Sequence, residues 1–382
     1  MRILITGANG FIGRNLTAAL RGRGYTDILA YDTDTPPALL EEWAAECGFV
    51  FHLAGVNRPK EEKDFMAGNA GFTAELLDAM RRHRNPCPVM LAYSIQAGLD
   101  NPYGRSKRAG EELLAVYGKE TGAGVLIYRF PNVFGKWCRP NYNSVVATFC
   151  YNIARGLPIT VNDPAAVLRL VYIDDLVEEL IRALGGQETR EGEFCAVPVT
   201  HTATLGKIAD ILRSFPESRR TLAVPDMGDP LTRKLYSTYL SYLPEDGFAY
   251  PLKMNEDARG SFTEILRTAD RGQFSVNVAK PGITKGNHWH HSKNEKFLVV
   301  SGRAVVRFRR IDSDEVIEYP VDGGHFTVVD IPTGYTHSIE NVGDTDLITF
   351  MWANEPFDPE HPDTYFLPVL REGPSDGERR QQ

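Results

Sequence analysis

The sequence predicts an α/β doubly wound parallel sheet followed by an all-β barrel. Three observations support this prediction. Over residues 1–130, short apolar runs alternate with segments of helical length and pattern, as in the βαβ units of a parallel sheet. A glycine-rich turn follows the first apolar run, where such sheets bind a dinucleotide. After about residue 250, short β-rich runs are separated by Gly, Pro, Asn and Asp, which indicates strands without helices.

The composition is that of a soluble globular protein, with 42% hydrophobic and 24% charged residues among 382. A net charge of −8 argues against non-specific nucleic-acid binding, which needs a basic face. No apolar run reaches the roughly 18 residues of a membrane span, and the five cysteines show no CxxC spacing. We therefore expect a cytoplasmic protein with reduced thiols and neither a nucleic-acid nor a membrane partner.

The first domain is expected to contain five strands, at residues 3–6, 28–31, 49–53, 89–93 and 125–130. Right-handed crossovers between parallel strands then give the doubly wound arrangement. From residue 131 to 245 the pattern loosens into helices and loops, which we interpret as the rest of this domain with a substrate-binding cap. The predicted divisions are a first domain at 1–245, a barrel at 246–371 and a disordered polar tail at 372–382.

The turn "TGANGFIG" places Gly7, Gly10 and Gly13 between the first expected strand and the first expected helix. Glycines permit the tight turn and a close approach of the backbone to a pyrophosphate, which the helix N-terminus stabilises. Asp32 ends the second strand and would accept hydrogen bonds from the ribose of NAD. Arg14 would instead pair with the 2′-phosphate of NADP, so the choice of nicotinamide cofactor stays open, and either charge could be a solvated loop residue.

The segment "NPYGRSK" spaces Tyr103 and Lys107 by four residues, one helical turn apart on one face. An ammonium near a phenol lowers the phenol pKa, and the tyrosine can then exchange a proton with a carbonyl oxygen. Ser94, at the end of the fourth expected strand, would supply a second hydrogen bond to that oxygen. These three residues are the predicted catalytic set.

Residues 1–245 resemble the extended short-chain dehydrogenase/reductase family through "TGANGFIG", "HLAG", "YGRSK", "RFPNVFG" and "VYIDDL". The resemblance implies a Rossmann fold, a nicotinamide cofactor and, very often, a nucleotide-sugar substrate. The resemblance also implies substrate contacts at Asn132 and Arg169. The cofactor contacts that it implies, besides the glycines, are Phe11, Ile12, Arg14, Asp32, Leu53, Ala54, Tyr103 and Lys107.

Four residues of the expected barrel suit a divalent metal ion: His288, His290, Glu295 and His337. His288 and His290 are two apart, so on a strand both side chains lie on one face. Three imidazoles and a carboxylate bind zinc, iron, manganese or nickel. His291 alternates to the opposite face and is not counted as a ligand.

Residues 282–302 and 332–341 resemble the two cupin motifs, although Gly324 lies one residue too early for the second. The resemblance implies a cupin barrel with the four residues above as ligands, and zinc as the metal. The segment "NEDARGSFTEILRT" is similar to the signature of dTDP-4-keto-sugar 3,5-epimerases, which implies a keto-sugar nucleotide in the barrel and a substrate contact at Arg259. The role of His325 stays undecided.

Nearly the whole chain resembles the bifunctional capsular-polysaccharide enzymes of the CapF/WbjC type. The resemblance is carried by segments such as "HLAGVNRP", "LYSTYLSYLP" and "SVNVAKPGITKGNHWHHSKNEKFLVVSG". The resemblance implies that the barrel epimerises C3 of UDP-2-acetamido-2,6-dideoxy-β-L-arabino-hexos-4-ulose. The reductase then reduces C4 with NADPH to UDP-N-acetyl-6-deoxy-L-talosamine, on the route to UDP-N-acetyl-L-fucosamine for capsule or O-antigen. A 4-keto group acidifies the C3 proton, and a divalent metal can act on the ketone as a Lewis acid. A homodimer is also expected.

Two alternatives stay open for the barrel. It could be a non-catalytic sugar-binding or dimerising module with a structural metal, or an iron-dependent oxygenase fused to a dehydrogenase. The residue that removes the C3 proton is not identified by the sequence. If the metal were structural, His291, Tyr335 and His325 would be candidates for an acid–base pair.

Overall fold

The computed structural model describes residues 1–59 and 61–371, so the tail expected at 372–382 lies outside the described residues. These residues form two compact units. The first unit contains Met1–Arg213 and Pro230–Glu245, and the second contains Ser214–Asp229 and the described residues from Asp246 onward. No helix in the described part of the chain combines the length and hydrophobicity that a membrane crossing needs.

The first unit is built on a seven-stranded sheet in the order β2-β1-β3-β4-β5-β9-β8. All neighbouring strands are parallel except β8 and β9, which form an antiparallel pair. The predicted α/β doubly wound fold is therefore confirmed. The strand bounds are β1 (Ile3–Thr6), β2 (Ile28–Tyr31), β3 (Phe49–His52), β4 (Val89–Ser94), β5 (Val125–Phe130), β8 (Arg190–Glu191) and β9 (Phe194–Cys195).

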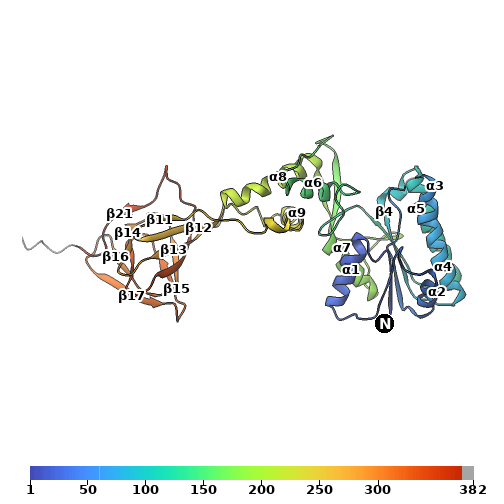
Figure 1. The fold of residues 1–382 in the computed structure, drawn as a ribbon, viewed down its shortest axis with the longest axis horizontal. Helices are drawn as coiled ribbons and strands as arrows, with labels where there is room; N and C mark the ends of the chain where they lie inside the picture. Colours follow the sequence, from blue (N-terminus) through green and yellow to red (C-terminus); the bar gives the residue numbers. More distant parts are fainter. Residues whose placement is uncertain (60, 372–382) are drawn as a thin grey trace, which may run out of the picture. The chain divides into compact units, whose positions relative to one another are not determined.

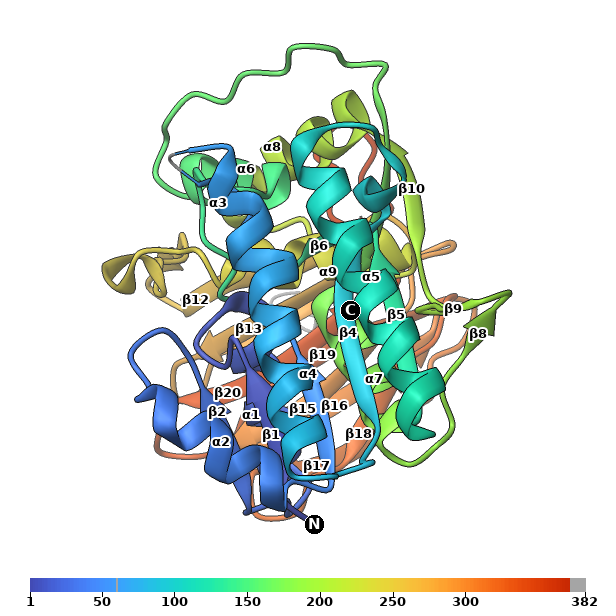
Figure 2. The ribbon, with the colours of Figure 1, turned by 90° about the vertical axis from the view of Figure 1, so that its right-hand side faces the viewer.

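Helices cover both faces of this sheet (Figure 1). Helices α1 (Phe11–Gly22) and α7 (Ile173–Leu184) pack together on one face. The other face carries α2 (Pro37–Glu46), α4 (Phe72–Arg82) and α5 (Pro102–Thr121), with α4 and α5 in front of the sheet in Figure 2. The four residues of β1 are all buried because Ile3 and Ile5 face one helical layer and Leu4 faces the other.

Shorter elements complete the first unit. A helix α3 (Lys63–Met66) continues through a π-helical turn η1 (Ala67–Gly71) into α4, and a 3₁₀ turn η2 (Ile95–Gly98) follows β4. The expected cap holds a second sheet in the order β10-β7-β6. The strands of this sheet are β6 (Asn132–Phe134), β7 (Val167–Tyr172) and β10 (His201–Thr204). Helices α6 (Val145–Ile153) and α9 (Pro230–Leu240) belong to the same region.

The division at 1–245 differs from the structure in one segment. Helix α8 (Leu205–Thr221) begins in the first unit, but Ser214–Asp229 belongs to the second. The reason is a pair of backbone hydrogen bonds: Val224 N donates to Arg267 O at 2.8 Å, and Arg267 N donates to Leu222 O at 2.8 Å. Sequence periodicity does not reveal this isolated β-bridge between Ala223 and Arg267, because the bridge depends on a partner more than 40 residues away.

The second unit is all-β, as predicted, with antiparallel strands in two sheets. Buried side chains from both sheets, including Phe297, Val299, Val306 and Ile339, form one core. The first sheet has the order β11 (Asn255–Asp257), β12 (Gly260–Thr268), β13 (Gly272–Ala279), β20 (Leu347–Ala353), β15 (Glu295–Ser301), β18 (Val328–Ile331). The second has the order β17 (Val316–Asp322), β16 (Arg303–Arg310), β19 (Tyr335–Asn341), β14 (Thr284–Trp289), β21 (Tyr365–Phe366).

Candidate active sites

The loop between β1 and α1 leaves no room for side chains at two of its glycines. Gly7 has φ +68°, and a Cβ there would lie 2.7 Å from Ala54 N. A Cβ on Gly13 would lie 2.3 Å from the Gly7 carbonyl oxygen. Gly10 is the N-cap of α1, so the helix begins directly at this bare backbone. A pyrophosphate requires such a surface beside a helix N-terminus, and the residues present therefore fit a dinucleotide.

The two charges that bear on cofactor choice lie in different surroundings. Asp32 accepts a hydrogen bond from Asn9 N at 2.7 Å and another from Thr33 N at 2.8 Å, so its carboxylate joins the end of β2 to the glycine loop. Arg14 is exposed on α1, and its guanidinium donates to Trp137 O at 2.7 Å. The structure thus places both residues beside the expected dinucleotide site without favouring one cofactor.

The remaining expected cofactor contacts flank the same loop. Leu53 N donates to Thr6 O at 3.1 Å, and Ala54 N donates to Thr6 Oγ1 at 3.3 Å, so both residues extend the end of β3 beside β1. Phe11 and Ile12, in the first turn of α1, pack against the core on that face of the sheet. These four residues therefore hold the loop in place.

Tyr103 and Lys107 lie one turn apart near the start of α5, where the Asn101 side chain accepts from Gly104 N at 2.7 Å. The Tyr103 hydroxyl donates to Asn57 Oδ1 at 2.9 Å. Lys107 is only 3% exposed, and its Nζ lies 5.5 Å from the centre of the Tyr103 ring. The structure therefore brings the expected tyrosine and lysine together at the carboxyl end of β4.

The proton affinities differ from the expectation drawn from the spacing. Burial raises the pKa of Tyr103 to about 12, although a hydrogen bond with Ser94 opposes this shift. Burial lowers the pKa of Lys107 to about 7. The expectation that Lys107 lowers the phenol pKa is wrong for this state of the protein. The ammonium lies against the ring and donates to Asn69 Oδ1 at 2.9 Å, and desolvation of the phenol dominates.

Sequence reasoning missed Asn69, which lies in the π-helical turn η1. Its Oδ1 accepts from Lys107 Nζ and from Val56 N, each at 2.9 Å, and its Nδ2 donates to Ser106 Oγ at 3.0 Å. It is 1% exposed, so one buried amide group accepts from the lysine and links the backbone of Val56 to the Ser106 side chain. The available signal was an asparagine between Gly68 and Gly71 within a helical pattern.

Two of the three expected substrate residues lie together in the first unit. Asn132 Nδ2 donates to the Arg169 carbonyl oxygen at 3.1 Å, because β6 and β7 are parallel and Asn132 pairs with Leu170. Arg259 belongs to the second unit, where its guanidinium pairs with Asp257 at 2.6 Å. The structure therefore brings Asn132 and Arg169 together and assigns Arg259 to the other unit.

The four expected metal ligands converge in the second unit. His288 lies on β14, His290 follows that strand, Glu295 begins β15 and His337 lies on β19. One ligand atom from each lies within 4.8 Å of all the others. A register shift between Gly286 and His288 places His288 directly opposite His337. The antiparallel pairing of β14 and β19 thus joins ligands that are 49 residues apart in the sequence.

The donor atoms of this cluster fit a cation. Among the described residues, no hydrogen-bond partner exists for His290 Nε2, Glu295 Oε2 or either ring nitrogen of His337. Glu295 Oε2 lies 3.7 Å from His290 Nε2 and 3.4 Å from His337 Nε2. Buried polar atoms are rarely left unpaired, and a divalent ion bound between them would satisfy His290 Nε2, Glu295 Oε2 and one of the two His337 ring nitrogens.

The protonation states agree with that fit. Burial and the neighbouring His337 lower the pKa of His288 to about 4. Burial opposes ionisation of Glu295, but the adjacent His290 and His337 outweigh it and hold the pKa of the carboxyl below its ordinary range. Neutral imidazole and ionised carboxylate are the forms that bind metal ions.

Two other histidines lie outside the cluster. The His291 ring packs 4.4 Å from the Trp289 ring and 4.9 Å from the Tyr365 ring, measured between ring centres, in agreement with its exclusion. His325 has a side chain that is 91% exposed and lies 3.5 Å from an Asp322 carboxylate oxygen. His325, whose role the sequence left undecided, therefore lies outside the set of candidate ligands.

A cavity of about 700 Å³ opens onto the cluster of candidate ligands. Its wall includes His288, Glu295 and His337. Eight residues of the epimerase-like segment also line it, including Asp257, Arg259, Phe262 and Glu264. The fold therefore brings an expected metal site and an expected sugar-nucleotide signature into one cavity. The cavity is large enough for a small organic ligand.

His291, Tyr335 and His325, the acid–base candidates for the case of a structural metal, are not among the residues that line this cavity. Lys285 and Lys293 line it instead. Lys285 Nζ donates to Val278 O at 2.7 Å and to Asn277 Oδ1 at 2.8 Å. Burial lowers the pKa of Lys285, but these acceptors stabilise its ammonium form.

Comparisons with known proteins agree with this two-part organisation. Residues 3–194 match the NAD dependent epimerase/dehydratase family, and residues 255–365 match the polysaccharide biosynthesis C-terminal domain. The chain is 47% identical to a UDP-2-acetamido-2,6-beta-L-arabino-hexul-4-ose reductase of Pseudomonas aeruginosa, over 97% of this chain and 99% of the relative.

Solved structures give the same result. The capsular polysaccharide assembling protein CapF of Staphylococcus aureus is 54% identical with a TM-score of 0.92, over 97% of this chain and 100% of that one. A UDP-glucose 4-epimerase of Thermus thermophilus is 22% identical with a TM-score of 0.52, over 63% of this chain and 99% of that one. At this identity the epimerase shows only that the fold of the first unit is shared.

Proposed function

This chain belongs to the NAD dependent epimerase/dehydratase family, and from that premise we propose that it is a bifunctional enzyme acting on a UDP-linked 4-keto sugar. The second unit epimerises C3, and the first unit then reduces the C4 ketone. The observation that carries the proposal is the presence of two separate sites, a glycine loop with Tyr103 and Lys107 in one unit and a buried ligand cluster in the cavity of the other.

The proposed substrate is UDP-2-acetamido-2,6-dideoxy-β-L-arabino-hexos-4-ulose. The name of the Pseudomonas relative supports a closely related UDP-keto-sugar and its reduction, and the match covers nearly all of both chains. The proposed product is UDP-N-acetyl-6-deoxy-L-talosamine, on the route to UDP-N-acetyl-L-fucosamine for capsule or O-antigen. The polysaccharide biosynthesis domain at residues 255–365 supports this use of the product. The proposed location is the cytoplasm. The proposed assembly is a homodimer, and light scattering tests this by measuring the molar mass.

Reduction is assigned to the first unit. NADPH, when bound, supplies the hydride that C4 receives. Tyr103 gives its phenolic proton to the C4 oxygen, and Ser94 donates a second hydrogen bond to the same oxygen. Lys107, with its pKa near 7, provides positive charge beside Tyr103 as the phenolate forms. One hydride at carbon and one proton at oxygen convert the ketone to an alcohol. NAD remains the alternative cofactor because Asp32 lies beside the glycine loop.

Epimerisation is assigned to the second unit. A divalent ion, proposed to be zinc, would be held by His288, His290, Glu295 and His337, and when bound supplies Lewis-acid polarisation of the ketone. Removal of the C3 proton leaves its electron pair in a C3–C4 double bond, with negative charge on the C4 oxygen. The ammonium of Lys285 in the cavity wall favours that charge. Return of a proton on the opposite face inverts C3 without any redox change.

The test uses the wild-type enzyme and the UDP-4-keto sugar in D₂O without nicotinamide. Deuterium should enter C3, as followed by NMR or mass spectrometry, and later addition of NADPH should give the reduced product. If no deuterium enters C3 while NADPH still reduces the ketone, the barrel is a sugar-binding or dimerising module and only the reductase stands. An exchange that requires oxygen would favour the oxygenase alternative.

A further inference from the structure

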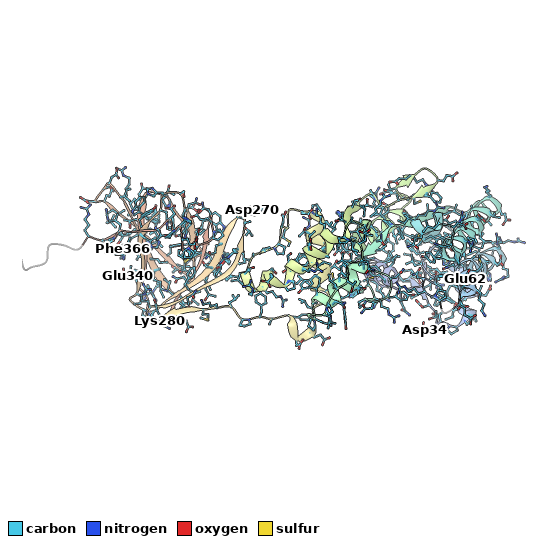
Figure 3. All side chains as sticks on the ribbon, turned by 90° about the horizontal axis from the view of Figure 1, so that it is seen from above. Asp34, Glu62, Asp270, Lys280, Glu340 and Phe366 are labelled. Atoms are coloured by element: carbon cyan, nitrogen blue, oxygen red, sulfur yellow. The ribbon has the colours of Figure 1, made fainter. Side chains whose placement is uncertain are left out.

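The second unit contains a strap of residues 362–369 that contacts the expected metal site from outside the ligand set. Within it, β21 pairs with the end of β14, with Phe366 opposite His288 and Tyr365 opposite Trp289. Phe366, labelled in Figure 3, is 78% exposed, so this strand lies on the outside of the barrel. The following residue, Leu367, donates from its backbone N to Asn287 O at 2.8 Å. The strap therefore runs alongside the strand that carries His288 and leads into His290.

Buried anchors hold the far end of the strap. Arg309, which is 2% exposed, donates to Pro368 O at 2.7 Å and to Val369 O at 2.9 Å. The Thr336 hydroxyl, next to the ligand His337, donates to the Leu367 carbonyl oxygen. These contacts fix the backbone of the strap independently of the residue that meets the metal ligands.

That residue is Asp363, which contacts the site in two ways. Its backbone carbonyl oxygen is hydrogen-bonded to His290 Nδ1. A carbonyl oxygen can only accept, so Nδ1 carries the proton and Nε2 keeps the lone pair. His290 Nε2 is the ring atom 3.7 Å from Glu295 Oε2. Asp363 therefore fixes both the ring orientation and the tautomer that metal binding requires.

The carboxylate of Asp363 holds the loop that joins two ligands. It accepts from three successive backbone amides: His291 N at 2.9 Å, Ser292 N at 2.7 Å and Lys293 N at 2.8 Å. Burial opposes ionisation, but these amides hold the pKa of Asp363 below its ordinary range. The bonded amides span most of the four residues between His290 and Glu295, so one side chain sets the separation of the two ligands.

We propose that Asp363 is the positioning residue of the metal centre, orienting His290 through its carbonyl group and the loop to Glu295 through its carboxylate. The inference rests on the proposed metal site. Asp363 touches none of the four ligand atoms that would bind the ion, since its bonds go to Nδ1 of His290 and to backbone amides. Removing the carboxylate should therefore weaken metal binding without removing a ligand. Loss of contacts of this kind typically changes metal affinity about 10–100-fold.

The experiment compares full-length Asp363→Ala and Asp363→Asn with wild type after chelation and dialysis. Zn²⁺ affinity is measured by competition with a chromophoric chelator, and Co²⁺ substitution gives a visible spectrum that reports ligand geometry. Asp363→Ala should bind Zn²⁺ about 10–100-fold more weakly, with an altered Co²⁺ spectrum. Asp363→Asn should lie between, because its amide oxygen replaces only one of the two accepting oxygens. Deuterium exchange at C3 should fall in the same order.

The matched control is Asp358→Asn in the same C-terminal segment. Asp358 accepts from Glu360 N at 2.9 Å and lies 3.2 Å from His361, and it meets no residue of the cluster. Its Zn²⁺ affinity and Co²⁺ spectrum should equal those of wild type. Circular dichroism verifies that each variant is folded, and the nearly isosteric Asp363→Asn serves if the alanine variant is not.

Three results overturn the inference or its basis. Folded Asp363 variants with wild-type Zn²⁺ affinity and Co²⁺ spectrum would show that Asp363 does not position the site. An equal loss in Asp358→Asn would show that the segment acts only through general stability. If wild type itself binds no stoichiometric divalent ion, the proposed metal site fails first, and that outcome is distinguishable because it needs no variant.

Discussion

The two sites of this chain satisfy their buried polar groups in opposite ways. In the first unit, Lys107 donates to Asn69, and His52 lies between Thr6 and Thr73 at 2.7 and 2.9 Å. In the second unit, the ligand atoms face one another at 3.4 and 3.7 Å without hydrogen-bond partners among the described residues. The first site is thus stabilised by the protein itself, whereas the second would gain its stabilising contact from the proposed cation.

This difference has a physical consequence for dependence on added groups. Paired buried groups keep their geometry without a ligand, because each lost bond would leave a costly unsatisfied partner. Ligand atoms that face one another gain most when an ion is bound, so we expect the stability of the second unit to depend on the proposed metal. We therefore expect the two activities to respond differently to substitution and to metal removal.

The largest expected effect is on epimerisation. His290→Ala removes one of four ligands, and deuterium exchange at C3 should fall by at least about 100-fold because the remaining three bind the ion more weakly. Reduction by NADPH of a keto sugar that already carries the inverted C3 should continue. Both rates are measured on the same preparation, after circular dichroism has established a folded protein. Chelation of wild type should give the same loss of C3 exchange, and added Zn²⁺ should restore the exchange.

The control is His325→Ala, since His325 is exposed in the same unit and lies outside the cluster. It should exchange C3 at the wild-type rate. Exchange at the wild-type rate in a folded, metal-free His290→Ala protein would break the comparison, because the cluster would then be structural.

Tyr103→Phe should have the opposite selectivity. Loss of general acid catalysis is typically worth roughly 10²–10⁴-fold, so NADPH oxidation with the keto sugar should fall by that factor. C3 exchange should persist and the ketone should accumulate. Mixing this variant with His290→Ala should restore some product, because the keto intermediate can diffuse between molecules. A matched control is Tyr25→Phe, at a partly buried tyrosine of the same unit. A Tyr103→Phe rate within threefold of wild type would rule out this residue as the acid.

A smaller effect is expected on cofactor choice. Asp32→Ala removes the carboxylate that accepts from Asn9 N, and binding of NADH should weaken about tenfold, as expected for one hydrogen bond to a charged group. NADPH binding should weaken less, so the preference shifts toward NADPH. Arg14→Ala should do the reverse. Dissociation constants for both cofactors are measured by fluorescence titration. An unchanged ratio in both variants would mean that neither residue selects the cofactor.

The smallest effect concerns the stability of the first unit and its dependence on pH. Lys107 has a folded pKa of about 7, below its unfolded value of about 10.4, so burying its charge costs stability in full below pH 7. That cost disappears as pH rises from 7 to about 10.5. Lys107→Met should therefore be more stable than wild type by at least ~1 kcal/mol at pH 6, and the difference should shrink by pH 10.

Urea unfolding at several pH values measures this difference. Asn69 Oδ1 keeps a hydrogen bond from Val56 N in the variant, so no buried acceptor is left unpaired. Lys119→Met, at an exposed lysine of the same helix α5, should show no comparable pH dependence. A pH-independent difference for Lys107→Met would mean that the ammonium is not desolvated as its burial indicates.

The fold classes and most candidate site residues were accessible from the sequence because their signals are local. Alternation of strands and helices over residues 1–130 predicted the doubly wound sheet, and short β-rich runs separated by Gly, Pro, Asn and Asp predicted the barrel. Tyr103 and Lys107 share a helix face because a helical turn has about 3.6 residues. The expectation that His288 and His290 lie on one face depends on strand geometry in the same way, although β14 ends at Trp289.

By itself, then, the sequence determined the two folds, the glycine loop and the set of four convergent metal-ligand candidates. Only the tertiary structure decided that Asn69 satisfies Lys107, that Asp363 meets His290 from 73 residues away, and that residues 214–229 join the barrel. It also decided the raised pKa of Tyr103. The physical reason is that spacing along a helix or strand is fixed by the covalent backbone, whereas burial and long-range hydrogen bonds exist only once distant segments have packed together.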